Sequence, residues 1–294
     1  MRKITAYLDL LRAHFIPAWI LIFSAGYMTA VRVYGGFEWL TLVKVILIAV
    51  FGFEAGMVLN DYVDRDLDKK DVENSLTKYF RPFKSRPLAN GILNPGIAMY
   101  TIIIFSIIAI FLIISLPSPH RFYVLLLMIY AYLVEYFYQI KKRNQKFPWA
   151  QLVGRTDFAL FPVAGYLILA TPDLNALLYF LYFYPLAEAH LAVNDLADYK
   201  NDQARGLLSV TKMYGINGTL IWIVVFTLIH LITATSFVLK VNPGSILGFL
   251  FSYIFIIFTC VYILSKRTPS SALKVLPLLH LSMAVQSLSL IFLY

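Results

Sequence analysis

The stretch FEAGMVLNDYVDRDLDKKD, residues 53–71, begins as apolar sequence typical of a membrane helix and ends in a run of carboxylates. A second stretch, AEAHLAVNDLADYKNDQ at residues 187–203, repeats the change from apolar to acidic. Of the 16 acidic residues in the chain, nine lie between positions 61 and 73 or between positions 195 and 202. Charge that is scarce elsewhere is therefore concentrated at the ends of two apolar segments.

The two stretches match at a single offset of 134 residues. Their shared pattern is E-A-x4-N-D-x2-D-x3-D, and its polar members are Glu54, Asn60, Asp61, Asp64 and Asp68 in the first copy and Glu188, Asn194, Asp195, Asp198 and Asp202 in the second. So many matched polar positions at one offset indicate an internal duplication.

The composition is that of an integral membrane protein. The 294 residues are 60% hydrophobic and 14% charged, with a mean hydropathy of +0.73. A spanning helix needs roughly 20 mostly apolar residues. Nine segments qualify, at 14–33, 39–60, 96–115, 121–139, 149–170, 174–194, 217–238, 244–264 and 272–293. The sequence therefore predicts an all-α bundle of nine transmembrane helices. Its single cysteine, Cys260, excludes an intrachain disulfide and a thiolate metal site.

The basic residues predict how the chain is oriented. The formal net charge is +9, but 20 of the 25 Lys and Arg residues fall on the side of the N-terminus once they are assigned to the ends of the nine segments. Because cytoplasmic loops are rich in Lys and Arg, we expect the N-terminus and both acidic stretches in the cytoplasm and the C-terminus outside, in the plasma membrane of a prokaryote. This distribution argues against nucleic acid as a binding partner. We expect membrane lipid around the chain, and the sequence indicates no obligate protein partner.

The second and sixth segments cross the membrane in the same direction, so the duplication predicts a parallel repeat about an axis along the membrane normal. Its four-helix halves would span about 1–140 and 141–270, with a ninth helix at 272–293, in one domain covering 1–294. Such an axis places the two acidic stretches at the same depth, facing each other across a central cavity.

Within each stretch the carboxylates share one helix face, because positions three, four and seven residues apart lie close together at about 100° per residue. Crowded carboxylates repel one another, and a divalent cation removes the conflict. All-oxygen ligands suit Mg²⁺, which also binds phosphate oxygens. Complementary basic residues lie in the following loops, at Lys78, Arg81, Lys84 and Arg86, at Lys141, Lys142, Arg143 and Lys146, and at Lys200, Arg205 and Lys212. Acidic faces and basic loops above an apolar cavity describe a site for an isoprenyl diphosphate.

These motifs resemble those of the UbiA-type intramembrane prenyltransferases. NDYVDRDLD is similar to the first aspartate motif of that family and NDLADYKND to the second, while SRPLANG, Tyr138 to Lys142 and GLLSVTKMYG resemble further family segments. The resemblance implies nine helices around a cavity open to lipid, and Mg²⁺-dependent transfer of a prenyl group to a lipophilic or aromatic acceptor with release of diphosphate. It implies two Mg²⁺ ions, held by Asn60, Asp61, Asp64 and Asp68 and by Asp195, Asp198 and Asp202.

The same resemblance implies a catalytic set of Asp64, Asp68, Asp198, Asp202, Lys142 and Tyr138, and substrate-binding roles for Asn60, Asn194, Lys84 and Arg86. We also expect Arg12, from its position on the motif side, and Lys141, from the basic loop, to bind the phosphates. One residue departs from the pattern: Asn201 stands where many members have glycine. The acceptor stays open between an aromatic ring in quinone biosynthesis, which we favour, and a glycerol phosphate in ether-lipid synthesis. The donor stays open between geranyl and geranylgeranyl diphosphate.

Two other classes of protein fit parts of the pattern. An ion-coupled transporter also has internal repeats and intramembrane acids, but it places them near the bilayer midplane. A diphosphate hydrolase or a prenyl-lipid binder would need no acceptor. Among other polar residues in the membrane segments, we expect Arg155 and Asp157 to pair with a neighbouring helix and His190 to hydrogen-bond within the bundle.

Overall fold

The structure, a computed structural model, describes residues 2–293. Eight of the helices described there are long and apolar enough to cross a membrane. They are α2 (Ile16–Tyr34), α3 (Trp39–Asp64), α5 (Pro95–Ile114), α6 (His120–Lys141), α9 (Leu174–Ala197), α11 (Val210–Val241), α12 (Ile246–Lys266) and α13 (Pro269–Phe292). The prediction of an all-α membrane bundle is confirmed.

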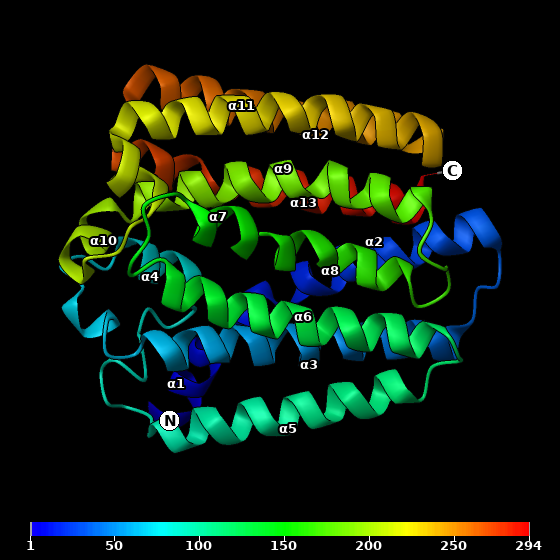
Figure 1. The fold of residues 1–294 in the computed structure, drawn as a ribbon, viewed down its shortest axis with the longest axis horizontal. Coiled ribbons are helices and arrows are strands. Elements are labelled where there is room, and N and C mark those ends of the chain that lie inside the picture. The colour runs from blue at the N-terminus through cyan, green and yellow to red at the C-terminus, as the bar shows by residue number, and fades with distance from the viewer. Residues whose placement is uncertain (1, 294) are drawn as a thin grey trace.

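The segment predicted as one helix at 149–170 is divided at Arg155 into two consecutive helices. It forms α7 (Trp149–Gly154) and α8 (Thr156–Tyr166), which follow one another along the bundle (Figure 1). At the break, the Thr156 hydroxyl donates to the Val153 carbonyl over 2.6 Å, and the Asp157 carboxylate accepts from the Phe158 N–H. Such local bonds from side chain to backbone often bend a helix, although Arg155 itself keeps helical backbone bonds to Gln151 and Ala159.

Both acidic motifs lie at the same end of the bundle. The long helices α3 and α9 end there, and three short helices gather around them: α1 (Arg2–Leu10), α4 (Ser75–Phe80) and α10 (Tyr199–Arg205). Figure 1 shows this group at one end of the molecule, whereas α13 finishes at the opposite end. Single turns at Ala13–Phe15, Asp68–Lys70 and Pro243–Ser245 complete the described elements. The orientation relative to the cytoplasm stays a prediction.

Large apolar side chains cover the outside of the bundle. Phe111 is 74% exposed, Leu126 is 64% exposed and Leu247 is 73% exposed. In water such a surface would aggregate, but lipid tails solvate it well. The centrally placed α9, by contrast, packs against α7, α8, α11 and α13 and buries most of its apolar side chains.

Two glycines let α2 and α8 cross at very short range. A Cβ atom on Gly26 would lie 1.9 Å from the Pro162 carbonyl oxygen, and one on Gly165 would lie 2.1 Å from the Phe23 carbonyl oxygen. Small residues allow membrane helices to approach to backbone contact. This crossing fixes the broken segment against α2 and so sets the position of Arg155, at the head of α8.

Candidate active site

A cavity of about 310 Å³ runs from the motif end of the bundle into its interior. At the motif end its wall is polar, with Asp64, Asp68 and Asp198 among the lining residues. Deeper in, the wall becomes apolar and reaches Ile113 at the end of α5 and Val124 near the start of α6. The cavity therefore has a charged mouth, formed by the motif residues, and an apolar floor at its inner end, formed by residues such as Ile113 and Val124.

Most residues predicted for the site line this cavity. They are Arg12, Asn60, Asp64, Asp68, Arg86, Tyr138, Lys142, Asn194, Asp195, Asp198 and Asp202. Three predicted residues are not part of its lining: Asp61, Lys84 and Lys141. Lys84 is exposed at a loop position with a φ of 64°, and Lys141 is half-buried in the last turn of α6. Their predicted roles at the substrate stay predictions.

Asp61 lies behind the cavity wall and is held by two arginines. Its Oδ1 accepts from Arg12 Nη2 over 3.0 Å, and its Oδ2 accepts from Arg81 Nη2 over 2.7 Å. Both oxygens are thus occupied by strong charge-assisted bonds. Arg81 itself is buried, and loss of hydration lowers its pKa even though the neighbouring Asp61 carboxylate opposes this. In this arrangement Asp61 places two arginines at the edge of the mouth.

Asp64 lies at the end of a polar chain that crosses from α3 to α6. Its Oδ2 accepts from Lys142 Nζ over 2.6 Å, and its Oδ1 accepts from Arg143 over 3.3 Å. Lys142 also donates to Gln139, which donates to Glu135. The chain ends where Asn60 Nδ2 donates to Glu135 over 2.8 Å. The Tyr138 ring completes this wall, with the Lys142 ammonium and the Arg155 guanidinium each 4.9 Å from its centroid.

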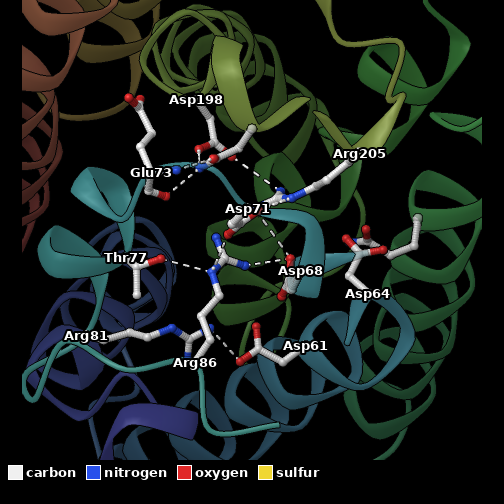
Figure 2. Close-up of polar contacts among 12 residues, drawn as sticks. Asp61, Asp64, Asp68, Asp71, Glu73, Thr77, Arg81, Arg86, Asp198 and Arg205 are labelled. Carbon is white, nitrogen blue, oxygen red and sulfur yellow. Dashed lines mark hydrogen bonds and ion pairs between the residues drawn. The ribbon is translucent and has the colours of Figure 1, made fainter. Parts of the chain in front are cut away.

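Two arginines bind the carboxylates at the mouth, and one of them, Arg205, joins the first motif to the second (Figure 2). Arg86 binds Asp68 over 2.6 Å and Asp71 over 3.0 Å. Arg205, from α10, binds Asp71, lies 3.5 Å from Asp68, and lies 3.3 Å from Asp198 of the second motif. Carboxylates of the two motifs thus lie on either side of one guanidinium group, that of Arg205.

Asn201, the residue that departs from the family pattern, also ties the two motifs together. Its Oδ1 accepts from the N–H groups of Val72 and Glu73 over 3.0 and 3.1 Å. Its Nδ2 donates to the Glu73 carbonyl over 3.0 Å and to Asp198 over 2.7 Å. A glycine here would remove all four bonds. The sequence shows the asparagine but gives no sign of this bracing role.

The second motif contains carboxyls that resist ionisation. Burial, together with the adjacent Asp198 carboxylate, raises the pKa of Asp202 to about 7. Burial also raises the pKa of Asp198, against the opposing charges of Arg205 and Arg86. Crowding of like charges in a dry place is what a bound cation relieves. A cation that binds here therefore displaces protons, and its affinity should rise with pH through neutrality.

Asp9, on α1, is a residue that the sequence analysis missed. Its carboxylate accepts from the N–H groups of Phe83 and Ser85 over 2.6 and 2.9 Å and from the Ser85 hydroxyl over 2.7 Å. Arg81 donates to the Asp9 carbonyl over 2.6 Å. Asp9 thus fastens the basic loop that carries Arg81 and Arg86. A single aspartate on an amphipathic segment carries no signal of this kind.

Aromatic rings form the wall just inside the mouth. Trp19 stacks on Phe53 with ring centroids 4.1 Å apart, and Phe53 contacts Phe161 at 4.8 Å. Phe158 meets both Trp19 and Phe53 edge-on, at 6.3 and 6.2 Å. All four rings line the cavity. Ring faces attract cations, so this wall suits a substrate on which positive carbon develops.

A family model agrees with this geometry over most of the chain. The model of the UbiA prenyltransferase family matches residues 19–284. The chain belongs to the UbiA prenyltransferase family. It is accordingly a prenyltransferase, and the resemblance noted from its motifs is confirmed.

Individual relatives agree with the family assignment. A protoheme IX farnesyltransferase of Baumannia cicadellinicola subsp. Homalodisca coagulata is 26% identical over 234 residues, which cover 78% of this chain and 75% of that protein. A solved digeranylgeranylglyceryl phosphate synthase superposes with a TM-score of 0.69 and 21% identity, covering 99% of this chain and 98% of the other. A UbiA homologue from Archaeoglobus fulgidus bound to DMAPP and Mg²⁺ gives a TM-score of 0.66 with 16% identity, covering 97% and 98%.

The residues of this UbiA-family chain fit Mg²⁺ when the ion shares its ligands with phosphate. The mouth offers only oxygen donors from Asp64, Asp68, Asp198 and Asp202, and the buried Asn194 Oδ1 has no hydrogen-bond partner. Within residues 2–293, however, no three acidic or histidine side chains converge into a cage of their own. Mg²⁺ typically takes one or two carboxylates, several waters and phosphate oxygens. The donor set therefore matches an ion that arrives with a diphosphate.

Proposed function

We propose that this protein transfers the prenyl group of a long isoprenyl diphosphate to a lipophilic acceptor within the membrane, with Mg²⁺ bound between its two aspartate motifs. One observation supports this most strongly: the carboxylates, the basic residues and the apolar floor belong to a single cavity. The charged mouth fits a metal-bound diphosphate and the floor fits its tail.

The residues at the mouth have separate tasks in this proposal. Arg86, Lys142 and Arg205 lie beside the carboxylates and face the cavity, where they would hold the diphosphate oxygens. Mg²⁺, when bound, supplies Lewis-acid stabilisation of the charge that grows on the leaving diphosphate. The fixed cations act in the same direction, because they are aimed at charge that develops in the transition state.

Breaking the C1–O bond leaves an allylic cation, which water would quench to an alcohol. The rings of Trp19, Phe53, Phe158 and Phe161 line the cavity directly below the charged mouth. They exclude water and offer π faces to the cation, at roughly 0.5–2 kcal/mol each. The acceptor then bonds to C1 in a dry compartment.

The depth of the cavity favours a long donor. Ile48 and Asp64 both line it and lie sixteen residues apart on α3, which corresponds to about 24 Å at 1.5 Å per residue. This length suits a chain of several isoprene units, so we propose geranylgeranyl diphosphate ahead of geranyl diphosphate.

Replacing Val124 with tryptophan is expected to shift the donor preference toward shorter chains. Val124 is buried and lines the floor, so an indole there would block the end of the tail. We expect kcat/KM for geranylgeranyl diphosphate to fall about tenfold or more, because overpacking a filled site typically costs about 1–3 kcal/mol and about 1.4 kcal/mol corresponds to tenfold, while geranyl diphosphate is used as before.

The matched control is Leu126→Trp on the same helix, whose side chain is 64% exposed and faces outward. Steady-state rates with the two donors measure both variants. An unchanged ratio of rates in Val124→Trp would show that the tail does not reach the floor.

A panel of acceptors tests the proposed function itself. Purified protein in lipid is mixed with geranylgeranyl diphosphate, Mg²⁺ and one acceptor at a time: an aromatic acid of the quinone type, a geranylgeranylglyceryl phosphate, or protoheme IX. Mass spectrometry identifies any prenylated product, and EDTA replaces Mg²⁺ in parallel reactions. A product that forms with Mg²⁺ and not with EDTA is expected. Equal turnover in EDTA would refute the metal assignment.

A further inference from the structure

Two histidines from distant parts of the chain meet at the cavity wall. His190 on α9 and His280 on α13 approach with their Nε2 atoms 2.9 Å apart. The second nitrogen of His280, Nδ1, lies 2.6 Å from the Tyr79 hydroxyl of α4. Both imidazoles line the cavity. The expected hydrogen bond of His190 within the bundle is thus present, but it leads to another titratable ring.

The position of His190 relates it to the second motif. It precedes Asn194 by one helical turn and Asp198 by eight residues, which places it about 12 Å deeper along α9. A diphosphate bound at the motif therefore has its carbon chain, and not its phosphates, level with His190. His190 thus lies on the carbon-chain side of the diphosphate, one helical turn from Asn194.

The surroundings of the pair leave one nitrogen free for substrate. Within residues 2–293, neither ring bonds to a carboxylate, and His190 Nδ1 has no hydrogen-bond partner. Phe15 and Phe80 pack against the His280 ring at 5.2 and 6.0 Å. The charged and titratable groups that face the pair are Arg155 beside His190 and His14 beside His280.

The hydrogen-bond pattern allows His190 to act as a base. The contact between the two Nε2 atoms holds one proton, so one ring donates and the other accepts. When His190 donates, His280 carries its own proton on Nδ1 and donates it to Tyr79. His190 then keeps the lone pair on Nδ1 available. This is the arrangement of a base oriented by a second group, as in nucleophile–base–orienter sites generally.

We propose that His190 is the catalytic base for the acceptor and that His280, held by Tyr79, positions it. The inference rests on the proposed prenyl transfer and names the step that follows C1–O cleavage. The electron pair of the C1–O bond leaves with the diphosphate, and an electron pair of the acceptor forms the new bond to C1. The atom that attacked then carries an acidic proton, which moves to Nδ1 of His190 and reaches solvent when the product leaves.

The proposal narrows the acceptor class. It requires an acceptor whose attacking atom carries a proton that it can lose, such as the hydroxyl of a glycerol phosphate lipid or a ring carbon of an electron-rich aromatic. Because the departing proton is strongly acidic once the new bond forms, a neutral imidazole is a sufficient base for it.

His190→Gln and His190→Ala test the base, with the acceptor that gives product in the panel above. Glutamine keeps a polar group near His280 but does not take up a proton at neutral pH. A general base contributes about 10²–10⁴-fold, so we expect kcat for transfer to fall at least 100-fold. Binding of the donor and slow release of diphosphate without acceptor should stay within threefold of wild type. Added imidazole should restore part of the rate in His190→Ala.

His120→Gln is the matched control, because His120 bonds to backbone carbonyls at 3.0 and 3.1 Å and does not line the cavity. Tyr79→Phe, which removes the group that holds His280, should lower kcat about five- to tenfold with donor binding unchanged. If His190→Gln does not fold, His280→Gln with the same readouts decides the question.

Transfer by folded His190→Gln within threefold of wild type would overturn the proposal. So would equal loss of donor binding and diphosphate release, since this would place His190 at the donor. Either result leaves the proposed prenyl transfer standing, because wild-type product formation tests that separately.

Discussion

Asp64→Asn and Asp198→Asn are each expected to lower prenyl transfer at least about 100-fold, the size of effect seen when one preorganised electrostatic group is removed from an active site. Asparagine keeps the shape of each side chain and removes its charge. Both carboxylates line the mouth, one on each motif, so neither replaces the other as a ligand. Rates measured over a range of Mg²⁺ concentrations should show a higher Mg²⁺ requirement in both variants.

Asp66→Asn provides the control for these variants. Asp66 belongs to the same motif but is exposed, does not line the cavity and pairs with Lys69. Exposed pairs of this kind contribute little, so Asp66→Asn should keep the wild-type rate. If Asp64→Asn or Asp198→Asn turned over normally at low Mg²⁺, the carboxylates of that motif would not be metal ligands.

The main features of the site were predictable because they depend on residue types that recur at fixed spacing in the sequence. Asp64 and Asp68 are four residues apart, which puts them near one another on a helix. Their copies, Asp198 and Asp202, follow from the duplication, and a membrane protein with parallel repeats brings such copies together. Membrane segments were predictable for a related reason, since the lipid requires long apolar stretches.

What the sequence did not reveal depends on contacts between distant elements. The division between α7 and α8 at Arg155 coincides with side chains that bond to local backbone, within a segment that is as apolar as a continuous helix. Asn201 and Asp9 act by fastening loops whose positions are known only once the chain has folded. His190 and His280 lie 90 positions apart, and no ligand spacing links them. Tertiary hydrogen bonds of this kind leave no periodic trace.

Arg205 has the largest structural role that the sequence understated. The sequence showed a basic residue after the second motif, one among several. In the structure its side chain is only 6% exposed and its guanidinium contacts Asp68, Asp71 and Asp198 together. These carboxylates come from both motifs and would repel one another without it. A planar group with several donors suits this position, and a lysine ammonium does not reproduce it.

Arg205→Ala is therefore expected to destabilise the protein and to abolish transfer. Leaving a buried ion pair without one partner costs about 3–5 kcal/mol, and here three acids lose a shared cation. Mg²⁺ with diphosphate should recover part of the lost thermal stability, because it returns positive charge to the same place. Lys200→Ala on the same helix is the control, since Lys200 is exposed and its ion pair among residues 2–293 is with Glu73. Thermal unfolding in detergent, with and without Mg²⁺ and diphosphate, measures both variants. An Arg205→Ala protein as stable and as active as Lys200→Ala would mean that the two motifs are held together by other contacts.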